Sequence, residues 1–579
     1  MALADYAVPA VLLRDHIVLN APPSARRLHR HSDCYTPENF MCSASPVSRL
    51  DPPKQAAPRN AYLVGTGIAA LAAAAYLVKE GGLSGPNIVL FEQMEQFGGS
   101  LDAHGNPKDG YVMRGGRMFE EKFNSTYDLL SFIPSIADPS KSAKDELMEF
   151  HQEFFWNDKA RLVSGGQIVD VSDLGFSERD RLDLIALCAA PESVLDVRTI
   201  QDWFEPHFFR SNFWFIWSTT FAFAPWHSAL EFKRYCLRFL HLFSTIDTMA
   251  GIYRTQFNQF DAMVRPIVAW LKARGVRLEM GAEVTDIDVG IEGGQKTATR
   301  LRYRQGDEDR AIDLAERDLV FVTNGSMTSD TSYGSMNTVP VLNTERNGGS
   351  WRLWERLAAK SPDFGCPAVF VSRIDQSKWE SFTVTADDSS FFDRLEAFSG
   401  SRAGKGGLVT IKDSNWLLTV VLNRQPHFYQ QPENVWVWWG YGLFPDKPGN
   451  FVQKPMSECT GREILIELLS HLRFTESIPH ILDTSRVIMA MMPYITAQFM
   501  PRVRTDRPKV IPEGSRNLAF IGQFCEIPDD VVFTVEYSVR AAQTAVFGLL
   551  DVQRPLSPFY KGQHDPRVLF DAWKTLHRH

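Results

Sequence analysis

The sequence predicts an α/β fold in which a dinucleotide-binding (Rossmann-like) domain is interrupted by a mixed α+β substrate domain, with extensions at both ends. Three observations lead to this prediction. A short apolar run, residues 61–64, is followed by the turn Gly65-Thr66-Gly67 and an alanine-rich helix. A second apolar run ends in Glu92, and strand-like runs return after long insertions. Strand, glycine turn and helix in this order are typical of a dinucleotide-binding domain.

The turn after the first strand suits a pyrophosphate. Gly65 and Gly67 let the backbone turn and come close to the phosphates, and a helix that begins at Ile68-Ala69 offers unpaired N–H groups to the anion. Glu92, followed by Gln93, ends the second strand, where such folds place a carboxylate that accepts hydrogen bonds from the ribose hydroxyls. Small residues in such a turn often serve only to allow close packing. Here the strand before the turn, the helix after it and Glu92 together favour nucleotide binding.

Paired glycines further along the chain favour FAD over a nicotinamide cofactor. They occur in Gly98-Gly99-Ser100 and in Arg114-Gly115-Gly116-Arg117. Glycine pairs allow the backbone to approach a flat ligand such as an isoalloxazine ring. Without the first motif, the same glycines would be interpreted as ordinary turns.

Two later segments return to the same domain. A strand around Gly281–Val284 is expected beside the adenine, and the apolar run 318–322 is closed by Thr323-Asn324-Gly325-Ser326. Residues 517–521 form another expected strand that ends at Gly522, and a helix after Asp530 would point its N-terminus at the flavin, near Phe533.

Length and periodicity give the domain organisation. A chain of 579 residues is too long for one core. We expect a flexible N-terminal extension (1–57), an FAD-binding domain in three segments (58–130, 259–335 and 507–552), a substrate domain in two segments (131–258 and 336–506) and a C-terminal tail (553–579). Helices are expected at 231–243, 260–273 and 463–473, and strands at 417–422 and 435–439.

Composition excludes several classes of protein. A net charge of -8 argues against a general nucleic-acid binder, which depends on clustered Lys and Arg. Seven scattered cysteines without a C-x-x-C pair predict reduced thiols and no metal site. The apolar stretch 8–13 is preceded by Asp5 and cut short by Arg14, which makes a poor secretory signal, so we expect a cytoplasmic protein, either a monomer or a homodimer.

Residues 211–230 contain no charged side chain and have about the length of a membrane span. Their Asn, Ser, Thr, Pro and His residues make them a poor span, so we predict an aromatic core that also borders a lipid-chain pocket. The helix expected at 231–243 is amphipathic. The tail carries basic residues beside aromatic ones and could dock as a helix, bind a partner or make a weak peripheral contact with a membrane.

Long blocks of the sequence resemble the oleate hydratase family, once called myosin-cross-reactive antigens. The blocks are Gly98–Asp102, Gly110–Arg117, Phe223–Ala229, Asn423–Phe428, Thr496–Arg502, Phe520–Phe524 and Glu536–Arg540. The resemblance extends from about Tyr62 to about Leu550. It implies FAD as cofactor and an unsaturated fatty acid as substrate.

The resemblance also implies site residues, with two departures from the family pattern. Tyr235, in Glu231-Phe232-Lys233-Arg234-Tyr235, takes the family's proton-donor position. Met118 replaces the glutamate that activates water, and Glu120 or Glu121 is expected to substitute for it. Asn423 and His427 keep the positions that hold the fatty acid head group, whereas Val421 replaces a threonine there.

Three functions remain open at this stage. The first is FAD-dependent hydration of the cis double bond of an oleate-like fatty acid to a hydroxy fatty acid, without net redox change. The second is a flavin-dependent isomerase or oxidoreductase acting on fatty acid double bonds. The third is a lipid-binding flavoprotein without catalysis, against which the retained Tyr235 and Asn423 argue.

Overall fold

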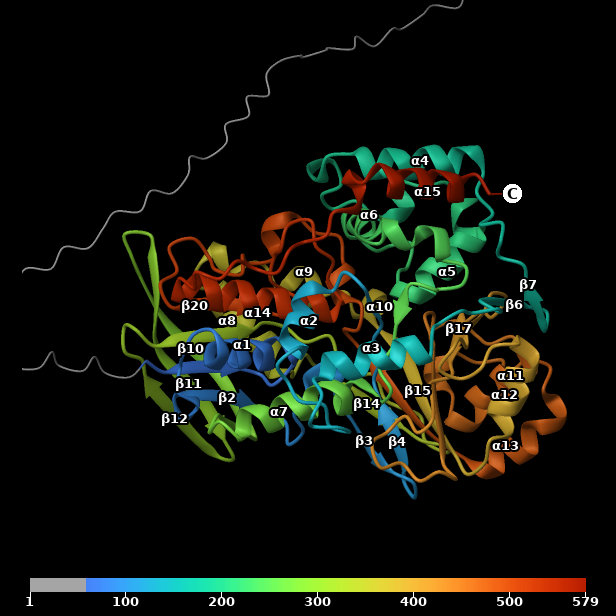
Figure 1. The fold of residues 1–579 in the computed structure, drawn as a ribbon, viewed down its shortest axis with the longest axis horizontal. Coiled ribbons are helices and arrows are strands. Elements are labelled where there is room, and N and C mark those ends of the chain that lie inside the picture. The colour runs from blue at the N-terminus through green and yellow to red at the C-terminus, as the bar shows by residue number, and fades with distance from the viewer. Residues whose placement is uncertain (1–58, 579) are drawn as a thin grey trace, which may run out of the picture. The chain divides into compact units, whose positions relative to one another are not determined.

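The structure, a computed structural model that describes residues 59–578, contains a parallel five-stranded sheet, which lies on the left of Figure 1. The extension predicted for residues 1–57 lies outside the described residues. In spatial order the strands are β20 (Leu518–Ile521), β13 (Leu319–Thr323), β1 (Ala61–Val64), β2 (Ile88–Glu92) and β9 (Arg277–Met280). Each neighbouring pair is parallel. The sheet is therefore assembled from three stretches far apart in the sequence, as the α/β prediction requires.

Both faces of this sheet are covered, which explains its apolar strands. Helix α1 (Ile68–Lys79) packs against α14 (Val535–Leu550), and β10 (Ala282–Glu292), β11 (Gln295–Gln305) and β12 (Glu308–Asp313) form an antiparallel sheet that contacts β2 and β20. The alanines of α1 are buried on every side. Small side chains are needed there because the helix packs closely against α14 and against strands β1 and β13.

A mixed eight-stranded sheet forms the second layer. Its order is β14 (Ser332–Gly334), β19 (Ser485–Met492), β15 (Trp379–Ala386), β18 (Trp436–Gly442), β17 (Leu418–Val421), β16 (Leu408–Ile411), β6 (Leu162–Ser164) and β7 (Gln167–Val169). The hairpin β3 (Ala103–Asn106) and β4 (Gly110–Met113) lies against β15, because Tyr111 N and Met113 N donate to the hydroxyls of Thr385 and Thr383. The hairpin follows β2 in the sequence and so leads the chain from the first sheet to the second.

The predicted helices 260–273 and 463–473 and strands 417–422 and 435–439 are present. The first of these is a π-helical turn η7 (Phe260–Val264) that continues into α7 (Arg265–Lys272). The second is α12 (Gly461–His471). Further helices include α2 (Asn124–Leu130), α3 (Ala143–Glu153), α4 (Glu178–Ala189), α8 (Gly349–Ala358), α9 (Ala368–Val371), α10 (Ile374–Ser377), α11 (Ser390–Ser399) and α13 (Ile478–Thr484). Strands β5 (Phe119–Glu120) and β8 (Ile252–Tyr253) pair next to the inner cavity described below.

The uncharged segment 211–230 forms a buried aromatic core, as predicted. Helix α5 (Asn212–Phe221) is followed by Ala222, whose φ of 62° is left-handed, and the chain then turns toward α6 (Ala229–Arg238). The ring of Trp217 contacts the rings of Phe213 and Phe232 here. Among the described residues, none of the helices combines the length and the apolar character that a bilayer-spanning helix needs.

The amphipathic helix expected at 231–243 differs in two respects. Helix α6 ends at Arg238, and the 3₁₀ segment η6 (Leu240–Thr245) follows. Its charged side chains Glu231, Arg234 and Arg238 are also buried, at no more than 3% exposure, because they form ion pairs within the protein. The polar face of this helix therefore faces the interior and not solvent.

The tail docks as a helix, which was one of the expected alternatives. Helix α15 (Pro566–Leu576) contacts η6, and the carbonyl of Leu576 accepts a hydrogen bond of 2.7 Å from Arg181 Nε of α4. Figure 1 shows α15 beside α4 and α6.

Candidate functional site

A large cavity of about 470 Å³ opens at the carboxyl ends of β1, β2 and β13. A volume in this range is usual for small-molecule sites, and open parallel sheets bind their ligands at this end. Residues from every predicted cofactor-binding segment line it: Gly65, Gly67, Ile68, Ala69, Glu92, Gln93, Gly99, Ser100, Arg114, Arg117, Val284, Thr323, Gly325, Ser326, Gly522 and Phe533. The geometry thus brings together segments that the sequence separates by hundreds of residues.

The glycine turn has the conformation that a pyrophosphate site requires. Gly65 has a φ of +91°, which a side chain would strain. Gly99 has a φ of +56°, and a Cβ placed on it would lie 3.0 Å from the Cα of Gly67. The two glycines therefore let two backbone segments meet at the N-terminus of α1, where free N–H groups favour an anion.

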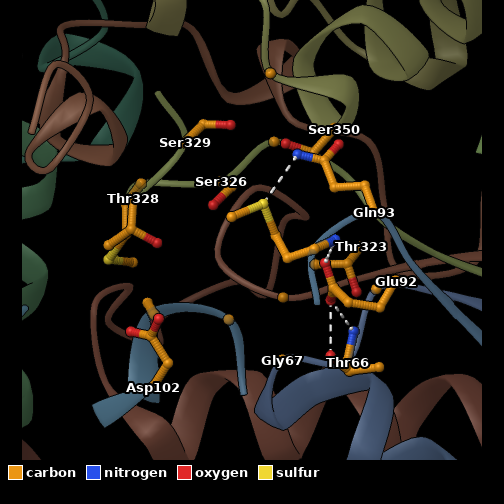
Figure 2. Close-up of a pocket in the computed structure, with 18 of the residues that line it drawn as sticks. Thr66, Gly67, Glu92, Gln93, Asp102, Thr323, Ser326, Thr328, Ser329 and Ser350 are labelled. Atoms are coloured by element: carbon orange, nitrogen blue, oxygen red, sulfur yellow. Dashed lines mark hydrogen bonds between the residues drawn. The ribbon is translucent and has the colours of Figure 1, made fainter. Parts of the chain in front are cut away.

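Glu92 is held at the edge of the cavity by its own turn (Figure 2). Its Oε2 accepts hydrogen bonds from the backbone N and the hydroxyl of Thr66, at 3.0 and 2.7 Å, and its Oε1 accepts one from Met94 N. A carboxylate fixed in this way at the end of the second strand is positioned to accept hydrogen bonds from ribose hydroxyls.

Arg114 ties together three loops around the cavity. Its Nε lies 2.9 Å from Asp102 Oδ1, and its other nitrogens donate to the carbonyl oxygens of Thr328 and Gly99, both at 2.8 Å. Because these groups occupy its hydrogen-bond donors, Arg114 holds in place the loops that form the wall of the cavity.

Two buried hydroxyls in the cavity have no partner among residues 59–578. They are the Oγ1 of Thr323 and the Oγ of Ser350 (Figure 2). A buried polar group without a hydrogen bond is unfavourable, so such groups point to a polar ligand. These two hydroxyls and the glycine turn together fit the dinucleotide cofactor FAD that the sequence predicts.

Four predicted cofactor residues lie outside the lining of this cavity. Gly98 packs against the ring of Phe260, buried Asn324 donates from its side chain to the carbonyl of Phe524, and Gly115 and Gly116 line the neighbouring inner cavity. Other lining residues were missed, among them Gly348, Gly349 and Ser350 at the start of α8. This Gly-Gly-Ser run repeats the Gly98-Gly99-Ser100 pattern, which was the available signal.

An inner cavity of about 40 Å³ adjoins the large one. The two share Arg117 and Phe533 as wall residues. The inner cavity is also lined by Gly115, Gly116 and Met118, by Val421 and by aromatic side chains, including Trp439 and Tyr441. A planar ligand end in the large cavity would therefore face a small, mostly apolar space.

Two further cavities each share one lining side chain with the inner cavity. The aromatic cavity, about 30 Å³, contains Phe221, Phe239 and Phe243 and shares Thr220 with the inner cavity. The histidine cavity, about 10 Å³, contains Asn423 and His427 and shares Arg254. Of the three residues predicted to hold the head group, Asn423 and His427 thus lie together, whereas Val421 lines the inner cavity.

Neither predicted substitute for the water-activating glutamate lines the inner cavity. Glu120 is 1% exposed, and its carboxylate lies 2.8 Å from Arg238 Nη2 and 3.0 Å from His241 Nε2. Burial opposes its ionisation, but His241 and Arg238 outweigh burial and lower its pKa. Glu121 is exposed and pairs with Lys122.

Tyr235 is buried and is not one of the residues that line the inner cavity. Its hydroxyl donates a hydrogen bond to the carbonyl of Val532, the residue before the shared wall residue Phe533. Burial, followed by the charges of Glu231 and Asp530, raises its pKa well above the ordinary value. Tyr235 therefore keeps its proton, and it lies next to the segment that separates the two cavities.

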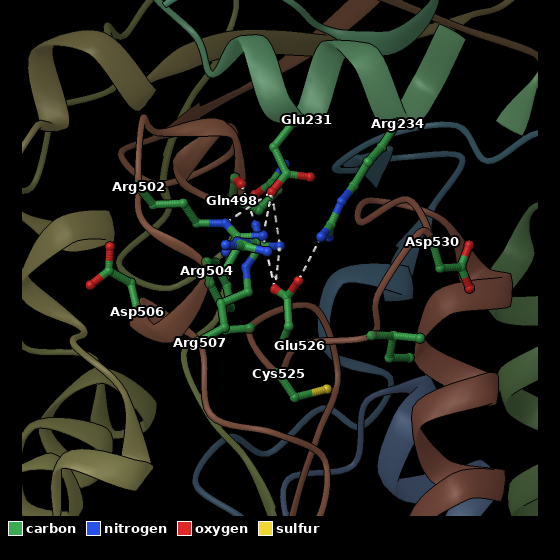
Figure 3. A network of polar contacts seen from close by, with 12 residues as sticks. Glu231, Arg234, Gln498, Arg502, Arg504, Asp506, Arg507, Cys525, Glu526 and Asp530 are labelled. Carbon is green, nitrogen blue, oxygen red and sulfur yellow. Dashed lines mark hydrogen bonds and ion pairs between the residues drawn. The ribbon is translucent and has the colours of Figure 1, made fainter. Parts of the chain in front are cut away.

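The helix that carries Tyr235 is anchored by a buried ion network (Figure 3). Glu231 accepts from Arg502 Nε at 2.9 Å and pairs with Arg507, while Arg234 bridges Glu192 and Glu526, each at 2.8 Å. Burial raises the pKa of Glu231, but the arginines outweigh it and lower this pKa to about 2. The network connects α6 to the loop that follows β20, and so fixes the position of Tyr235.

Comparisons with known proteins identify relatives along nearly the whole chain. The chain is 40% identical to an oleate hydratase of Streptococcus pyogenes serotype M49 (strain NZ131), with 94% of this chain and 93% of that protein covered. It is 31% identical to a linoleate hydratase of Lactiplantibacillus plantarum, with 89% and 98% covered.

A solved structure, cyclohexylamine oxidase from Brevibacterium oxydans IH-35A, shares the fold with a TM-score of 0.52 at 14% identity, over 85% of this chain and 99% of that one. The family model described as the MCRA family matches residues 58–547. The chain therefore belongs to the MCRA family, which confirms the resemblance carried by its sequence motifs.

Proposed function

We propose that this protein hydrates the cis double bond of an unsaturated, oleate-like fatty acid with the help of FAD, giving a hydroxy fatty acid without net redox change. The main support for this proposal is that Arg117 and Phe533 line both a dinucleotide-sized cavity and an apolar inner cavity. The hydratase names of two relatives that align over nearly their whole length support it.

FAD would be held by the residues of the large cavity. Its pyrophosphate would meet the N-terminus of α1 at Gly67 and Gly99, and its adenosine ribose would meet Glu92. When bound, FAD supplies a planar, polar surface beside the inner cavity that shapes the site and places charge there. The hydroxyls of Thr323 and Ser350, which have no partner among residues 59–578, would donate hydrogen bonds to FAD.

Tyr235 is the proposed proton donor. In the reaction its O–H bond breaks, the proton adds to one alkene carbon, and a water oxygen adds to the other carbon. A proton released by that water then restores the tyrosine, so the atoms balance. The nearby cations Arg507 and Arg117 favour the tyrosinate that forms during transfer.

The water is proposed to lie against the wall formed by residues 115–118. No carboxylate of residues 59–578 lines the inner cavity, and Met118 has no group that accepts a proton. Backbone carbonyls of this wall would orient the water, and Glu120 would stabilise the wall through its pairs with Arg238 and His241. Glu120 as the base remains the competing assignment.

A weak peripheral contact with a membrane is proposed for α15, in a protein that works in the cytoplasm. Its inner face buries Ala572 and Leu576, whereas Phe570 and Trp573 are 55% and 53% exposed. Lys574 lies beside them, and apolar and basic side chains on one exposed face are typical of helices that lie on lipid. Such a contact would bring the protein to its substrate.

The proposal is tested by incubating the purified protein with FAD and oleate and analysing the product by mass spectrometry. A hydroxystearate formed without consumption of NADPH and without peroxide is expected. A shifted double bond would indicate an isomerase, and stoichiometric NADPH oxidation an oxidoreductase. Oleate recovered unchanged, although bound, would leave only the lipid-binding alternative.

A further inference from the structure

Arg254 is a buried cation without an anionic partner in the described part of the chain. It follows β8, is 8% exposed, and its Nε and Nη2 atoms have no hydrogen-bond partner. Its guanidinium lies 4.4 Å from the centre of the Trp156 ring. Burial, which is the largest effect, lowers its pKa to about 10, so the group still carries its charge at neutral pH.

Asp158, the carboxyl group among residues 59–578 that favours this charge most, already has hydrogen-bond partners of its own. Asp158 accepts hydrogen bonds from the backbone N of Gly407 and Leu408 and from Trp156 Nε1. It also lies 3.9 Å from Arg161, a second buried arginine that opposes the charge of Arg254. Two buried guanidinium groups are thus accompanied by one carboxyl group. The site would therefore stabilise a further negative charge.

Arg254 also lies where the inner and histidine cavities meet, since it lines both. A Cβ placed on Gly116 would lie 3.7 Å from its Nη1 atom, so one end of the guanidinium faces the wall of the inner cavity. On the other side are Asn423 and His427. Burial, and then the charge of Arg254, lower the pKa of His427 to about 3, so this imidazole is neutral and supplies no second positive charge.

Arg117, the other arginine of the inner cavity, is differently placed. Its nitrogens donate to the carbonyl oxygens of Gly116 and Ser100, and its guanidinium lies 5.4 Å from the centre of the Phe533 ring. Arg117 thus has partners on the cofactor side. Arg254 is the arginine whose donors are left for a ligand.

We propose that Arg254 is the charged anchor for the carboxylate of the fatty acid, an inference that rests on the proposed function. A planar guanidinium binds a carboxylate through two parallel hydrogen bonds, and such charge-assisted pairs are stronger than neutral ones. The acyl chain then extends from Arg254 through the inner cavity, past Thr220, toward the aromatic cavity. Asn423 and His427 add neutral hydrogen bonds, and the anchor offsets the hydrogen bond missing at Val421.

The test compares binding of oleate with binding of methyl oleate, which has the same chain but no charge. The wild-type holoprotein should bind oleate at least tenfold more tightly. Arg254→Gln should weaken oleate binding about 10- to 100-fold, as expected for a lost charge-assisted contact, and change methyl oleate binding less than about threefold. Arg254→Lys should recover part of the loss, since it keeps the charge but not the paired donors.

Controls separate this role from packing and from cofactor binding. Arg394→Gln, at an exposed position of α11, removes the same charge and should leave both affinities unchanged. Because Arg254 is unpaired, Arg254→Gln should keep FAD affinity and should not lower Tm.

Equal wild-type affinity for the acid and the ester would overturn the inference. Equal losses for both ligands in Arg254→Gln, or a loss of FAD, would do the same. Binding is measured apart from turnover, so a protein that binds oleate through Arg254 without hydrating it would contradict the proposed function and leave this inference standing.

Discussion

Replacing Glu120 by glutamine distinguishes a structural carboxylate from a catalytic base. The side chain is buried and accepts hydrogen bonds from Arg238, His241 and the backbone N of Lys122. Glutamine has nearly the same shape and still accepts from Lys122 N. What it removes is the negative charge beside Arg238, whose side chain is only 2% exposed.

The expected loss of stability follows from this burial. Removing one partner of a buried ion pair typically costs about 3–5 kcal/mol, and the retained hydrogen bonds place Glu120→Gln near the lower end, at about 3 kcal/mol. The free energy of unfolding is measured by denaturant titration of the holoprotein, and oleate turnover is measured under conditions in which the variant stays folded. We expect turnover within about tenfold of the wild type.

The pH dependence provides a second signature of the same charge. The pKa of folded Glu120 lies below its ordinary value of 4.5. Its stabilising contribution is therefore complete above that value and is lost as the pH falls through the lowered folded pKa. The difference in stability between wild type and Glu120→Gln should be largest at neutral pH and shrink in acid.

Glu121→Gln is the matched control, because Glu121 is exposed and its pair with Lys122 contributes at most about 1 kcal/mol. Stability and turnover should both be close to wild type. If Glu120→Gln instead kept its stability and lost turnover more than 100-fold, Glu120 would be the base and the structural assignment would be refuted.

Three other substitutions test the remaining roles. Met118→Glu places a carboxylate in the inner cavity beside Arg117, so we expect oleate turnover to increase about tenfold or more; a decrease would indicate that a base is already present. Tyr235→Phe should lower turnover by about two to four orders of magnitude while fatty acid and FAD still bind, and a variant with half the wild-type rate would remove Tyr235 from the mechanism. Gly67→Val projects a side chain into the large cavity and should abolish FAD binding in a fluorescence titration, whereas unchanged affinity would contradict the assigned pyrophosphate site.

The nucleotide-binding half could be predicted because its signals are local. A parallel strand buried on both faces is a continuous apolar run, and the turn at Gly65, with a φ of +91°, favours a residue without a side chain. Both features are visible in a few consecutive residues. The strands β1, β2, β13 and β20 were found in this way.

The parts that the sequence did not indicate depend on contacts between distant segments. The sequence indicated an amphipathic helix at α6 but not its ion pairs, because the partners Arg502, Arg507 and Glu526 lie more than 250 residues away. Ser350 was assigned to the substrate domain although it lines the large cavity. Arg254 was overlooked because its significance lies in an absence of partners, which only a folded structure can reveal.

The measurement that tests the central claim most directly is the origin of the oxygen in the product. The holoprotein is incubated with oleate in heavy-oxygen water, without NADPH, and the hydroxy fatty acid is analysed by mass spectrometry. Hydration predicts one heavy oxygen atom in the new hydroxyl group of every product molecule. A hydroxy fatty acid without the label would contradict hydration, because its oxygen would then come from dioxygen through flavin redox chemistry.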